Sequence, residues 1–414
     1  MEDGNTGEGN TGDGNTGHGN TEDGIVVVGG GFAGFWAAVA GRRVAGPDVP
    51  IILVTPDPWL QMRPRLYESN PETLSVDLRD PLTSVGVGLL LDRAVALDTT
   101  SRLLTLGSGK TIGYEKLVVA VGSVMRRPPV PGAELAFSID TQTEAIAFDL
   151  RLAELASRRR SLSIAVIGAG FTGIELALEL RDRIAVHAGH DAGERARLVL
   201  LDRTDVVGSE LGAGPRPVIE LALDAARVER RLGISIVGIA PHHPGLFRIV
   251  FSDATTLDVD NVVLATGLVA SPFVEQIPGH HDPLGRVVVD SSLRTPEAPD
   301  VFAAGDAAAA DVGDGHHTLQ SCQHALQLGR YAGENAARDL LGMETLPYKQ
   351  ERYVTCLDLG RAGAVLTTGW DRTVSLSGSE AKALKRTINT EVIYPPLNVS
   401  AQELLRASNI TPSG

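Results

Sequence analysis

Short runs of consecutive apolar residues recur along the chain and predict strands that are buried on both faces of a parallel sheet. The first two runs are Ile25–Val28 and Ile51–Thr55. Segments with helical periodicity alternate with such runs, beginning with Phe32–Val44. Strands that alternate with helices predict a doubly wound α/β architecture. Further strand runs are Leu117–Val121, Ile164–Ile167, Leu198–Leu201, Ile234–Ile239 and Val262–Ala265, and further helical segments are Thr143–Arg159, Gly173–Ala188 and Pro215–Leu232.

The pattern changes after Asp306. A long amphipathic helix is predicted over Leu319–Leu341, and a segment rich in β-branched residues and glycine follows over Tyr353–Leu376. A basic helix is predicted over Ser379–Ile388. This order predicts a small α+β region at the C-terminal end of the chain.

The first 23 residues have a different character. Residues 1–23 repeat the tetrapeptide GNTG plus one variable residue, and after Met1 they contain no apolar side chain. A segment of this kind has no apolar surface to offset the entropy lost on ordering, so we expect a disordered acidic tail.

Composition narrows the class of protein. The 414 residues include 37 Lys and Arg and 51 Asp and Glu, which gives a formal net charge of −14. The length predicts two or three domains, and the acidic balance argues against nucleic-acid binding and against general attraction to anionic lipid. Two cysteines, Cys322 and Cys356, fit a reducing compartment and are too far apart for a CxxC element. Neither a secretory signal nor a membrane-spanning helix is evident, so a cytoplasmic protein is expected.

Two glycine-rich turns follow predicted strands and have the spacing GxGxxG. In this spacing the first glycine makes a tight turn, the second lets backbone N–H groups approach a pyrophosphate, and the third brings the helix close to the strand. Two such turns, each between a strand and a helix, indicate two dinucleotide sites. The glycines are Gly29, Gly31 and Gly34 in the first turn and Gly168, Gly170 and Gly173 in the second.

The residue that ends the second strand of each unit is expected to bind ribose hydroxyls. In the second unit this residue is Asp202, whose carboxylate repels a 2′-phosphate and favours NADH over NADPH. The neighbouring Arg203 favours the opposite choice. In the first unit the position is Thr55, with Asp57 two residues later, and a threonine binds a ribose less strongly than a carboxylate does.

Together these features resemble the two-dinucleotide flavoprotein family, the pyridine-nucleotide oxidoreductases, over roughly residues 24–345. Tyr114–Ser123 and Leu264–Gly267 are similar to the family's two turns at the interdomain crossover, and Val301–Ala307 is similar to its second flavin motif. In the family, FAD lies on the first glycine turn and NAD(P)H on the second. The resemblance implies cofactor contacts for Gly122, Gly267, Gly305 and Asp306.

The resemblance also implies two Rossmann-like domains, with the FAD-binding domain interrupted by the NAD(P)H-binding domain. We expect a tail at 1–23, the two parts of the FAD-binding domain at 24–155 and 280–345, the NAD(P)H-binding domain at 156–279, and a C-terminal α+β interface region at 346–414.

The absence of paired cysteines indicates the branch of the family. Disulfide reductases carry a CxxxxC pair after the first unit, where this chain reads Trp59–Glu68 without cysteine, so a dithiol relay is excluded. Sulfide:quinone reductases also need reactive cysteines, which disfavours that branch. Arg65, in the same stretch, is expected to contact a cofactor.

Residues 319–335 resemble the AQxAxQxG motif of type II NADH dehydrogenases, with Cys322 in place of the first alanine. In that group the helix lies beside the flavin ring, and its two glutamines border the quinone site. The resemblance implies this role for Gln323 and Gln327, which are four residues apart and therefore share one helix face. Two polar residues on a solvated face are the alternative, and Cys322 is expected to be a buried filler.

Glu175 and the basic segment Ala381–Arg386 each allow two interpretations. Glu175 follows the second turn as TGxE and resembles the family's glutamate near the nicotinamide, although an acid in the first turn of a helix is also favoured by the helix dipole. Ala381–Arg386 is similar to the family's lysine-bearing segment over the flavin, but a solvated face is the favoured interpretation.

Three pairs of adjacent histidines invite a metal interpretation. No acidic or thiol ligand completes any pair at metal spacing, so no metal is expected. His316 and His317 lie between the flavin motif and the glutamine helix and remain candidates for the acceptor pocket. The other pairs are His242 with His243 and His280 with His281.

The resulting hypothesis is an FAD-dependent NAD(P)H:acceptor oxidoreductase of the type II NADH dehydrogenase-like group. Hydride passes from NAD(P)H to flavin N5, and electrons then pass to a quinone or another small organic acceptor. The alternatives are a biosynthetic flavoprotein acting on a small metabolite and a redox-sensing protein resembling apoptosis-inducing factors. Val399–Gly414 is a poor membrane anchor, so only peripheral membrane contact is expected. A homodimer is compatible with the sequence.

Overall fold

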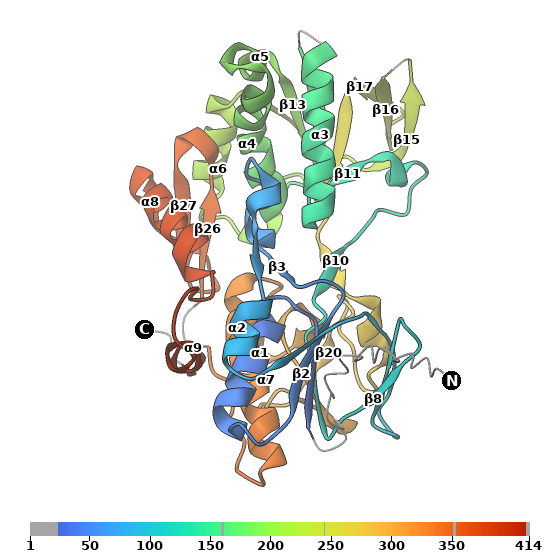
Figure 1. The fold of residues 1–414 in the computed structure, drawn as a ribbon. Helices are drawn as coiled ribbons and strands as arrows, with labels where there is room; N and C mark the ends of the chain where they lie inside the picture. Colours follow the sequence, from blue (N-terminus) through green and yellow to red (C-terminus); the bar gives the residue numbers. More distant parts are fainter. Residues whose placement is uncertain (1–23, 159–160, 244, 351–352, 411–414) are drawn as a thin grey trace, which may run out of the picture.

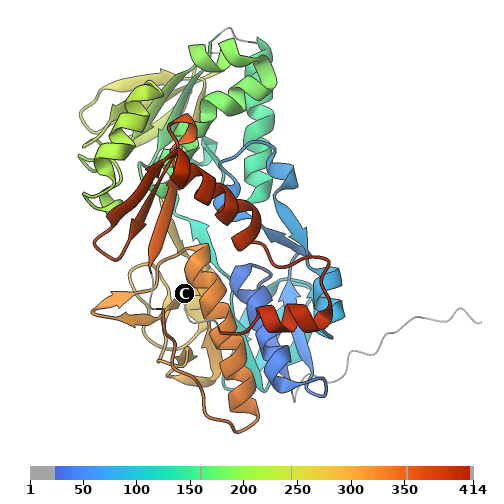
Figure 2. The same cartoon turned by 90° about the vertical axis from the view of Figure 1, so that its left-hand side faces the viewer.

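The computed structural model describes residues 24–158, 161–243, 245–350 and 353–410, so the GNTG tail lies outside the described residues. Two α/β units are stacked end to end, with the second above the first in Figure 1. The C-terminal elements lie along one side of both units and come to the front in Figure 2.

The first unit is built on a six-stranded sheet with the order β21-β22-β9-β1-β2-β5. β1 pairs in parallel with β2 and β9, and β22 extends the parallel set on the far side of β9. Every residue of β1 is buried, as an apolar run at the centre of a covered sheet requires. The bounds are β1 Ile25–Val28, β2 Ile51–Thr55, β5 Gly88–Leu91, β9 Lys116–Val119, β21 Arg294–Thr295 and β22 Ala298–Ala303.

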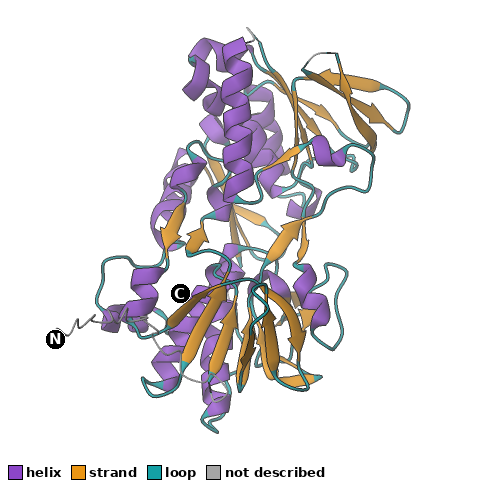
Figure 3. Ribbon diagram, turned by 45° about the vertical axis from the view of Figure 1, so that its right-hand side comes forward, coloured by secondary structure: helices purple, strands orange, loops and turns teal. Residues whose placement is uncertain are grey.

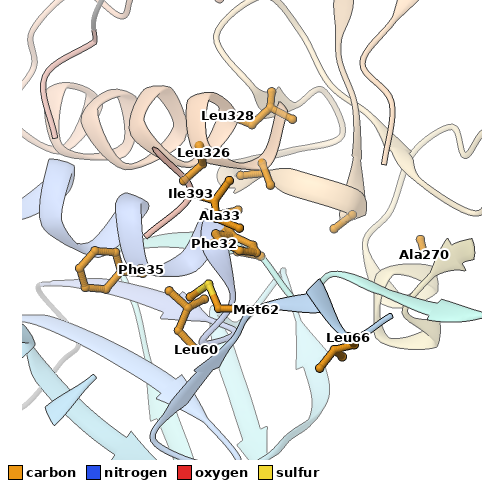
Figure 4. Packing of buried hydrophobic residues seen from close by; sticks show 14 of the residues in the cluster. Phe32, Ala33, Phe35, Leu60, Met62, Leu66, Ala270, Leu326, Leu328 and Ile393 are labelled. Atoms are coloured by element: carbon orange, nitrogen blue, oxygen red, sulfur yellow. The ribbon is translucent and has the colours of Figure 1, made fainter. Parts of the chain in front are cut away.

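Two helices, α1 (Phe32–Ala45) and α7 (Cys322–Leu340), pack on this sheet and on each other at unusually short range. A Cβ at Gly329 would lie 2.3 Å from the Ala33 carbonyl oxygen, and one at Gly333 would lie 2.0 Å from that of Ala37. Figure 4 shows Ala33 and Phe32 of α1 facing Leu326 of α7. The closeness of the two helices therefore depends on glycine in α7.

The second unit has a five-stranded, all-parallel sheet with the order β11-β18-β12-β13-β14. Helices α3 (Gln142–Arg158) and α4 (Phe171–Ala188) pack against each other, and an antiparallel sheet of β15, β16 and β17 closes a smaller core with the parallel strands. The strand bounds are β11 Phe137–Ser138, β12 Ser163–Ile167, β13 Arg197–Leu201, β14 Val228–Arg231, β15 Ile236–His242, β16 Leu246–Phe251, β17 Thr256–Val259 and β18 Asn261–Leu264.

Two expectations differ from this arrangement. The helix expected over Pro215–Leu232 ends early: α6 spans Arg216–Ala225, and β14 follows because it pairs with β13 at the sheet edge. The domain boundary expected between residues 155 and 156 falls inside α3, and β11, which precedes it, pairs with β18 of the second sheet.

The chain passes between the units through an antiparallel pair, β10 (Ser123–Met125) with β19 (Leu268–Ala270). Figure 3 shows these short strands between the two main sheets. The remaining elements of the two units are β3 Trp59–Gln61, β4 Ser75–Asp77, α2 Arg79–Ser84, β6 Ala94–Asp98, β7 Leu103–Leu106, β8 Thr111–Gly113, α5 His190–Arg195, β20 Val287–Val288, β23 Ala308–Ala309, β24 Asp311–Gly313 and β25 His316–His317.

The C-terminal region is α+β, as the sequence predicts. A three-stranded antiparallel sheet of β26 (Val354–Asp358), β27 (Ala364–Thr368) and β28 (Thr373–Gly378) carries α8 (Ser379–Thr387). β26 contacts α4 of the second unit, while α9 (Ala401–Ala407) contacts α1 of the first. This region therefore bridges the two units.

The short contact between α1 and α7 generates a stability prediction. Replacing either Gly333 or Gly41 with alanine raises helix propensity, and both new Cβ atoms would face backbone of the other helix. At Gly333 the Cβ would overlap the Ala37 carbonyl oxygen at 2.0 Å, whereas at Gly41 it would lie 3.4 Å from the Gly333 carbonyl oxygen, an ordinary contact. We expect Gly333→Ala to lower the free energy of unfolding by about 1–3 kcal/mol and Gly41→Ala to leave it unchanged or higher. Urea denaturation of both variants measures this, and equal stability would contradict the packing.

Candidate functional site

The first glycine turn joins β1 to α1, and its three glycines have different roles. Gly29 has φ +108°, and a Cβ there would lie 2.2 Å from the Ala120 carbonyl oxygen. A Cβ at Gly34 would lie 1.7 Å from the Gly29 carbonyl oxygen. By contrast, a Cβ at Gly31 would meet no atom within 4 Å. There is therefore no room for a side chain at Gly29 or Gly34. The backbone around Gly31, at the start of α1, is open for a ligand to approach.

The second turn, between β12 and α4, repeats this geometry at its first and third glycines. Gly168 has φ +111°, and a Cβ at Gly173 would lie 1.8 Å from the Gly168 carbonyl oxygen. The middle glycine differs. A Cβ at Gly170 would lie 2.5 Å from Oε1 of Glu210, and the Phe171 backbone N–H donates to that same oxygen at 3.2 Å.

Both expected ribose-binding residues lie at strand ends beside these turns. The Thr55 hydroxyl would be 2.6 Å from a Cβ at Gly30, and it donates to the Asp57 carbonyl oxygen at 3.0 Å. The Asp202 carboxylate accepts from the backbone N–H of Ala169 at 2.6 Å and of Thr204 at 2.8 Å. Each side chain therefore lies at the carboxyl edge of its sheet, where open α/β folds bind ligands.

Gly122 and Gly267 lie at the crossover between the units. Gly122 has φ +71° and Gly267 has φ +87°, a backbone conformation that favours glycine. The Gly267 carbonyl oxygen accepts from the Arg126 N–H, and the Gly122 carbonyl oxygen accepts from the Ser271 N–H. The two glycines therefore shape the strands that connect the sites.

Asp306 lies in a 3₁₀ turn, Gly305–Ala307, that fits between α1 and α7. A Cβ at Gly305, where φ is +67°, would lie 2.9 Å from the Ala33 Cβ. The Asp306 carboxylate accepts from the Ser123 hydroxyl at 2.6 Å, and burial raises its pKa. This turn, which follows β22 late in the sequence, thus places the Asp306 carboxyl group near the start of α1.

Of the two arginines in the stretch after β3, it is Arg63 that lies near Asp306. Arg63 Nη1 donates to the Ser123 hydroxyl at 3.3 Å, and Arg63 Nε donates to the Asp140 carbonyl oxygen. Arg65, the residue expected from the sequence, instead pairs with Glu68 at 2.7 Å and donates to the Tyr394 hydroxyl. The two arginines stand at opposite ends of one 3₁₀ turn, and the sequence offers no signal that separates them.

Gln323 and Gln327 lie in the first turns of α7, which the Ser321 hydroxyl caps by accepting from the His324 N–H. Oε1 of Gln327 is buried and has no hydrogen-bond partner among the described residues. An orphaned buried acceptor of this kind fits a site that binds a donor. Burial raises the pKa of the neighbouring Cys322 thiol to about 11, so this cysteine is protonated and unsuited to act as a nucleophile.

Glu175 is buried and forms an ion pair with Lys385 of α8, at 2.9 Å. Its carboxylate also accepts from the backbone N–H of Asp358 at 2.9 Å, and the Lys385 ammonium lies 5.6 Å from the centre of the Phe171 ring. Burial raises the pKa of Glu175 to about 7, against the opposing effect of Lys385. The solvated face favoured for the basic helix is therefore wrong at Lys385, which is only 5% exposed.

Other polar groups complete this cluster. The Tyr67 hydroxyl donates to the Asp358 carboxylate at 3.1 Å and accepts from Asn389 Nδ2 at 3.2 Å. Burial raises the pKa of Tyr67 well above its usual value, and burial raises the pKa of Glu179, one turn along α4 from Glu175, to about 7. Sequence reasoning missed Tyr67 and Asp358, because contacts between distant segments leave no local pattern.

Among the described residues, no group of three His, Cys, Asp or Glu side chains is placed to hold a metal ion. His316 stacks on Trp370 with ring centroids 4.4 Å apart, and Tyr353 also stacks on Trp370, with ring centroids 4.3 Å apart. His242 lies against His243 at 4.0 Å.

The residues present fit two dinucleotides. The first turn leaves open backbone at a helix N-terminus, with Thr55 and Asp306 at its sides, and the second repeats the turn beside Asp202. Within the described residues, no helix combines the length and apolar composition needed to cross a membrane. Fold and site together define a flavoprotein-like oxidoreductase with two dinucleotide sites and no redox disulfide.

Comparison with known proteins agrees with this class. The family model for pyridine nucleotide-disulphide oxidoreductases matches residues 23–329. The chain is 40% identical over 394 residues to an NADH dehydrogenase-like protein of Mycobacterium tuberculosis, covering 93% of this chain and 97% of that protein. It is 25% identical over 387 residues to demethylphylloquinone reductase of Synechocystis, covering 88% and 90% respectively. Among solved structures, the ferredoxin reductase of Rhodopseudomonas palustris matches with a TM-score of 0.69 and 25% identity, covering 84% of this chain and 82% of that one.

The chain therefore belongs to the pyridine nucleotide-disulphide oxidoreductase family. It is an FAD-dependent oxidoreductase that acts on NAD(P)H.

The raised pKa of Glu175 generates a prediction about stability and pH. An unperturbed glutamate has a pKa of about 4.3. The folded state therefore binds more protons than the unfolded state between about pH 4 and 7, and this contribution to stability is lost as the pH rises through that range. We expect the free energy of unfolding to fall more between pH 5 and 7.5 in the wild type than in Glu175→Gln, by about 2 kcal/mol.

Urea denaturation at the two pH values measures this difference. Glu380→Gln, which removes an exposed carboxylate from α8, serves as the control and should keep the wild-type pH dependence. Parallel pH profiles for the wild type and Glu175→Gln would show that Glu175 does not titrate in this range.

Proposed function

We propose that this protein is an NADH:quinone oxidoreductase. The observation that carries the proposal is the position of Gln323 and Gln327 on α7, the same helix that packs against the Asp306 turn. The orphaned amide oxygen of Gln327 suits a bound group that donates a hydrogen bond. The similarity over most of its length to a demethylphylloquinone reductase supports a quinone as the acceptor.

FAD would be held by the first glycine turn, with Thr55, Asp306 and Arg63 beside it. When bound, the flavin supplies the ability to accept hydride from a nicotinamide and to pass two electrons to an acceptor. The chain's own groups supply the binding geometry and the electrostatics. The hydrogen bond from the Ser123 hydroxyl, which also accepts from Arg63, holds the carboxyl group of Asp306 in one position.

NADH would be held by the second turn. Asp202 is fixed by two backbone N–H groups, so its carboxylate stays at the sheet edge and repels a 2′-phosphate. Arg203 is exposed, and no contact with the described side chains holds its guanidinium beside Asp202. This difference favours NADH over NADPH.

Glu175 and Lys385 would handle a proton. Two-electron reduction of a quinone to a quinol takes up two protons, and NADH supplies only one of them with its hydride. A carboxyl group with a pKa of about 7 can hold or release a proton near neutral pH. The ion pair with Lys385 keeps this group in place, and the cluster around Tyr67 and Asp358 fixes both partners.

We also infer that the protein works in the cytoplasm with at most peripheral membrane contact. Four apolar side chains of the C-terminal elements are exposed, which suits loose contact with the surface from which a quinone is drawn. They are Leu384, Val392, Leu397 and Val399.

The cofactor prediction is tested by the visible spectrum of the purified protein and by anaerobic titration. We expect a yellow protein whose flavin absorbance is bleached by NADH, and about tenfold less effectively by NADPH, since repulsion of about 1.4 kcal/mol corresponds to a factor of ten. Asp202→Asn should reduce the preference for NADH over NADPH. A colourless protein that takes up no FAD on reconstitution would contradict the assignment.

The acceptor prediction concerns the two glutamines. Replacing Gln327 by leucine removes the hydrogen-bonding amide, so the KM for a ubiquinone analogue should rise about tenfold, the loss of roughly one hydrogen bond. The rate at which NADH reduces the flavin in stopped-flow should stay unchanged, and Gln276→Leu, on the outer surface beside β6, is the control. NADH oxidation that is no faster with quinone than with oxygen would rule out the quinone.

A further inference from the structure

The two glycine turns differ in what lies over their middle glycine. A Cβ at Gly31 would meet nothing within 4 Å, whereas a Cβ at Gly170 would lie 2.5 Å from the Glu210 carboxylate. In the first turn the start of the helix is therefore open, and in the second a carboxylate of the chain itself covers it. The two turns share one backbone design, so this difference comes from the neighbouring loop.

The Glu210 carboxylate binds to the start of α4 as a bound anion would. Its Oε1 accepts from the backbone N–H of Phe171, the first residue of α4, at 3.2 Å. This N–H belongs to the group of donors that a dinucleotide pyrophosphate contacts in such turns. A carboxylate there also gains from the positive end of the helix dipole. Glu210 thus makes the same type of contact that a phosphate oxygen would make.

The loop that carries Glu210 is attached to the glycine turn, while the side chain itself is free to leave. The Gly208 N–H donates to the Ala169 carbonyl oxygen at 2.9 Å, and Leu211 is buried. Glu210 is exposed. The backbone therefore keeps the carboxylate near the turn, and a rotation of the exposed side chain is enough to remove it.

The charges around Glu210 bear on what happens when a nucleotide arrives. Arg372 lies over the Tyr353 ring, with its guanidinium carbon 4.8 Å from the ring centre, and its Nη1 is buried with no partner among the described residues. A Cβ at Gly212, two residues from Glu210, would lie 3.6 Å from the Arg372 Cγ. A buried cation therefore lies close to the loop that carries Glu210. A pyrophosphate brings two further negative charges.

We propose that Glu210 is an internal competitor for the pyrophosphate of NAD(P)H: it occupies the N-terminus of α4 in the free site and must be displaced for the nucleotide to bind. This inference rests on NAD(P)H binding at the second turn. Glu210 weakens binding in two ways, because its contact with Phe171 is lost and because the displaced carboxylate stays close to two phosphates. The first turn, which lacks such a carboxylate, has no equivalent penalty.

The test compares Glu210→Gln with the wild type by calorimetric titration of the flavin-loaded protein. ADP-ribose, which carries the pyrophosphate, should bind about fivefold more tightly to the variant, and adenosine, which has no phosphate, should bind equally to both. The gain should shrink at high salt, because the repulsion is screened. Glu210→Ala, which removes the side chain altogether, should show at least the same gain.

Glu220→Gln is the matched control, since it removes the same charge from α6 of the same unit. It should leave the affinity for ADP-ribose unchanged. An affinity for ADP-ribose that is unchanged or weaker in both Glu210 variants would overturn the inference while leaving NAD(P)H binding intact. A wild-type protein that binds no ADP-ribose and whose flavin NADH does not reduce would overturn the nucleotide assignment itself and this inference with it.

Discussion

Contact between the third glycine of each turn and the carbonyl group of the first determines where α1 and α4 begin. The Cβ of any other residue would lie 1.7 Å from that carbonyl oxygen at Gly34 and 1.8 Å at Gly173. Because this contact is so short, each helix starts directly above the end of its strand, and its first N–H groups point to the carboxyl edge of the sheet. Thr55 and Asp202 end the neighbouring strands at that same edge, so each dinucleotide site follows from one backbone contact.

A second level of organisation brings distant segments to these two edges. The Gly305–Ala307 turn fits between α1 and α7 and places Asp306 at the Ser123 hydroxyl, and Lys385 of α8 pairs with Glu175. Glu175 is buried and Asp306 is partly buried, and an unpaired charge would be costly in such surroundings. The C-terminal region thus completes the polar cluster between the two units as well as covering apolar surface. This explains why its basic helix has a buried lysine.

The difference between the two turns fits the proposed assignment of FAD to the first turn and NAD(P)H to the second. The first presents open backbone and a threonine, while the second presents two carboxylates, those of Asp202 and Glu210, to an anionic nucleotide. A cofactor that remains bound needs the first arrangement. A substrate that must leave after each turnover is better served by a site that already contains a weak competitor for its phosphates.

The architecture could be predicted from the sequence, because apolar runs and glycine spacing are local properties. Both glycine turns, Thr55, Asp202 and the Asp306 motif could be located, because each is recognised from a few neighbouring positions in the sequence. It did not determine the side-chain partners. Nothing local distinguishes Arg63 from Arg65, or a buried Lys385 from a solvated one, and the early end of α6 depends on pairing between β14 and β13. Only the tertiary structure decided these points, because burial, ion pairing and the seat of Glu210 at α4 arise when segments far apart in the chain come into contact.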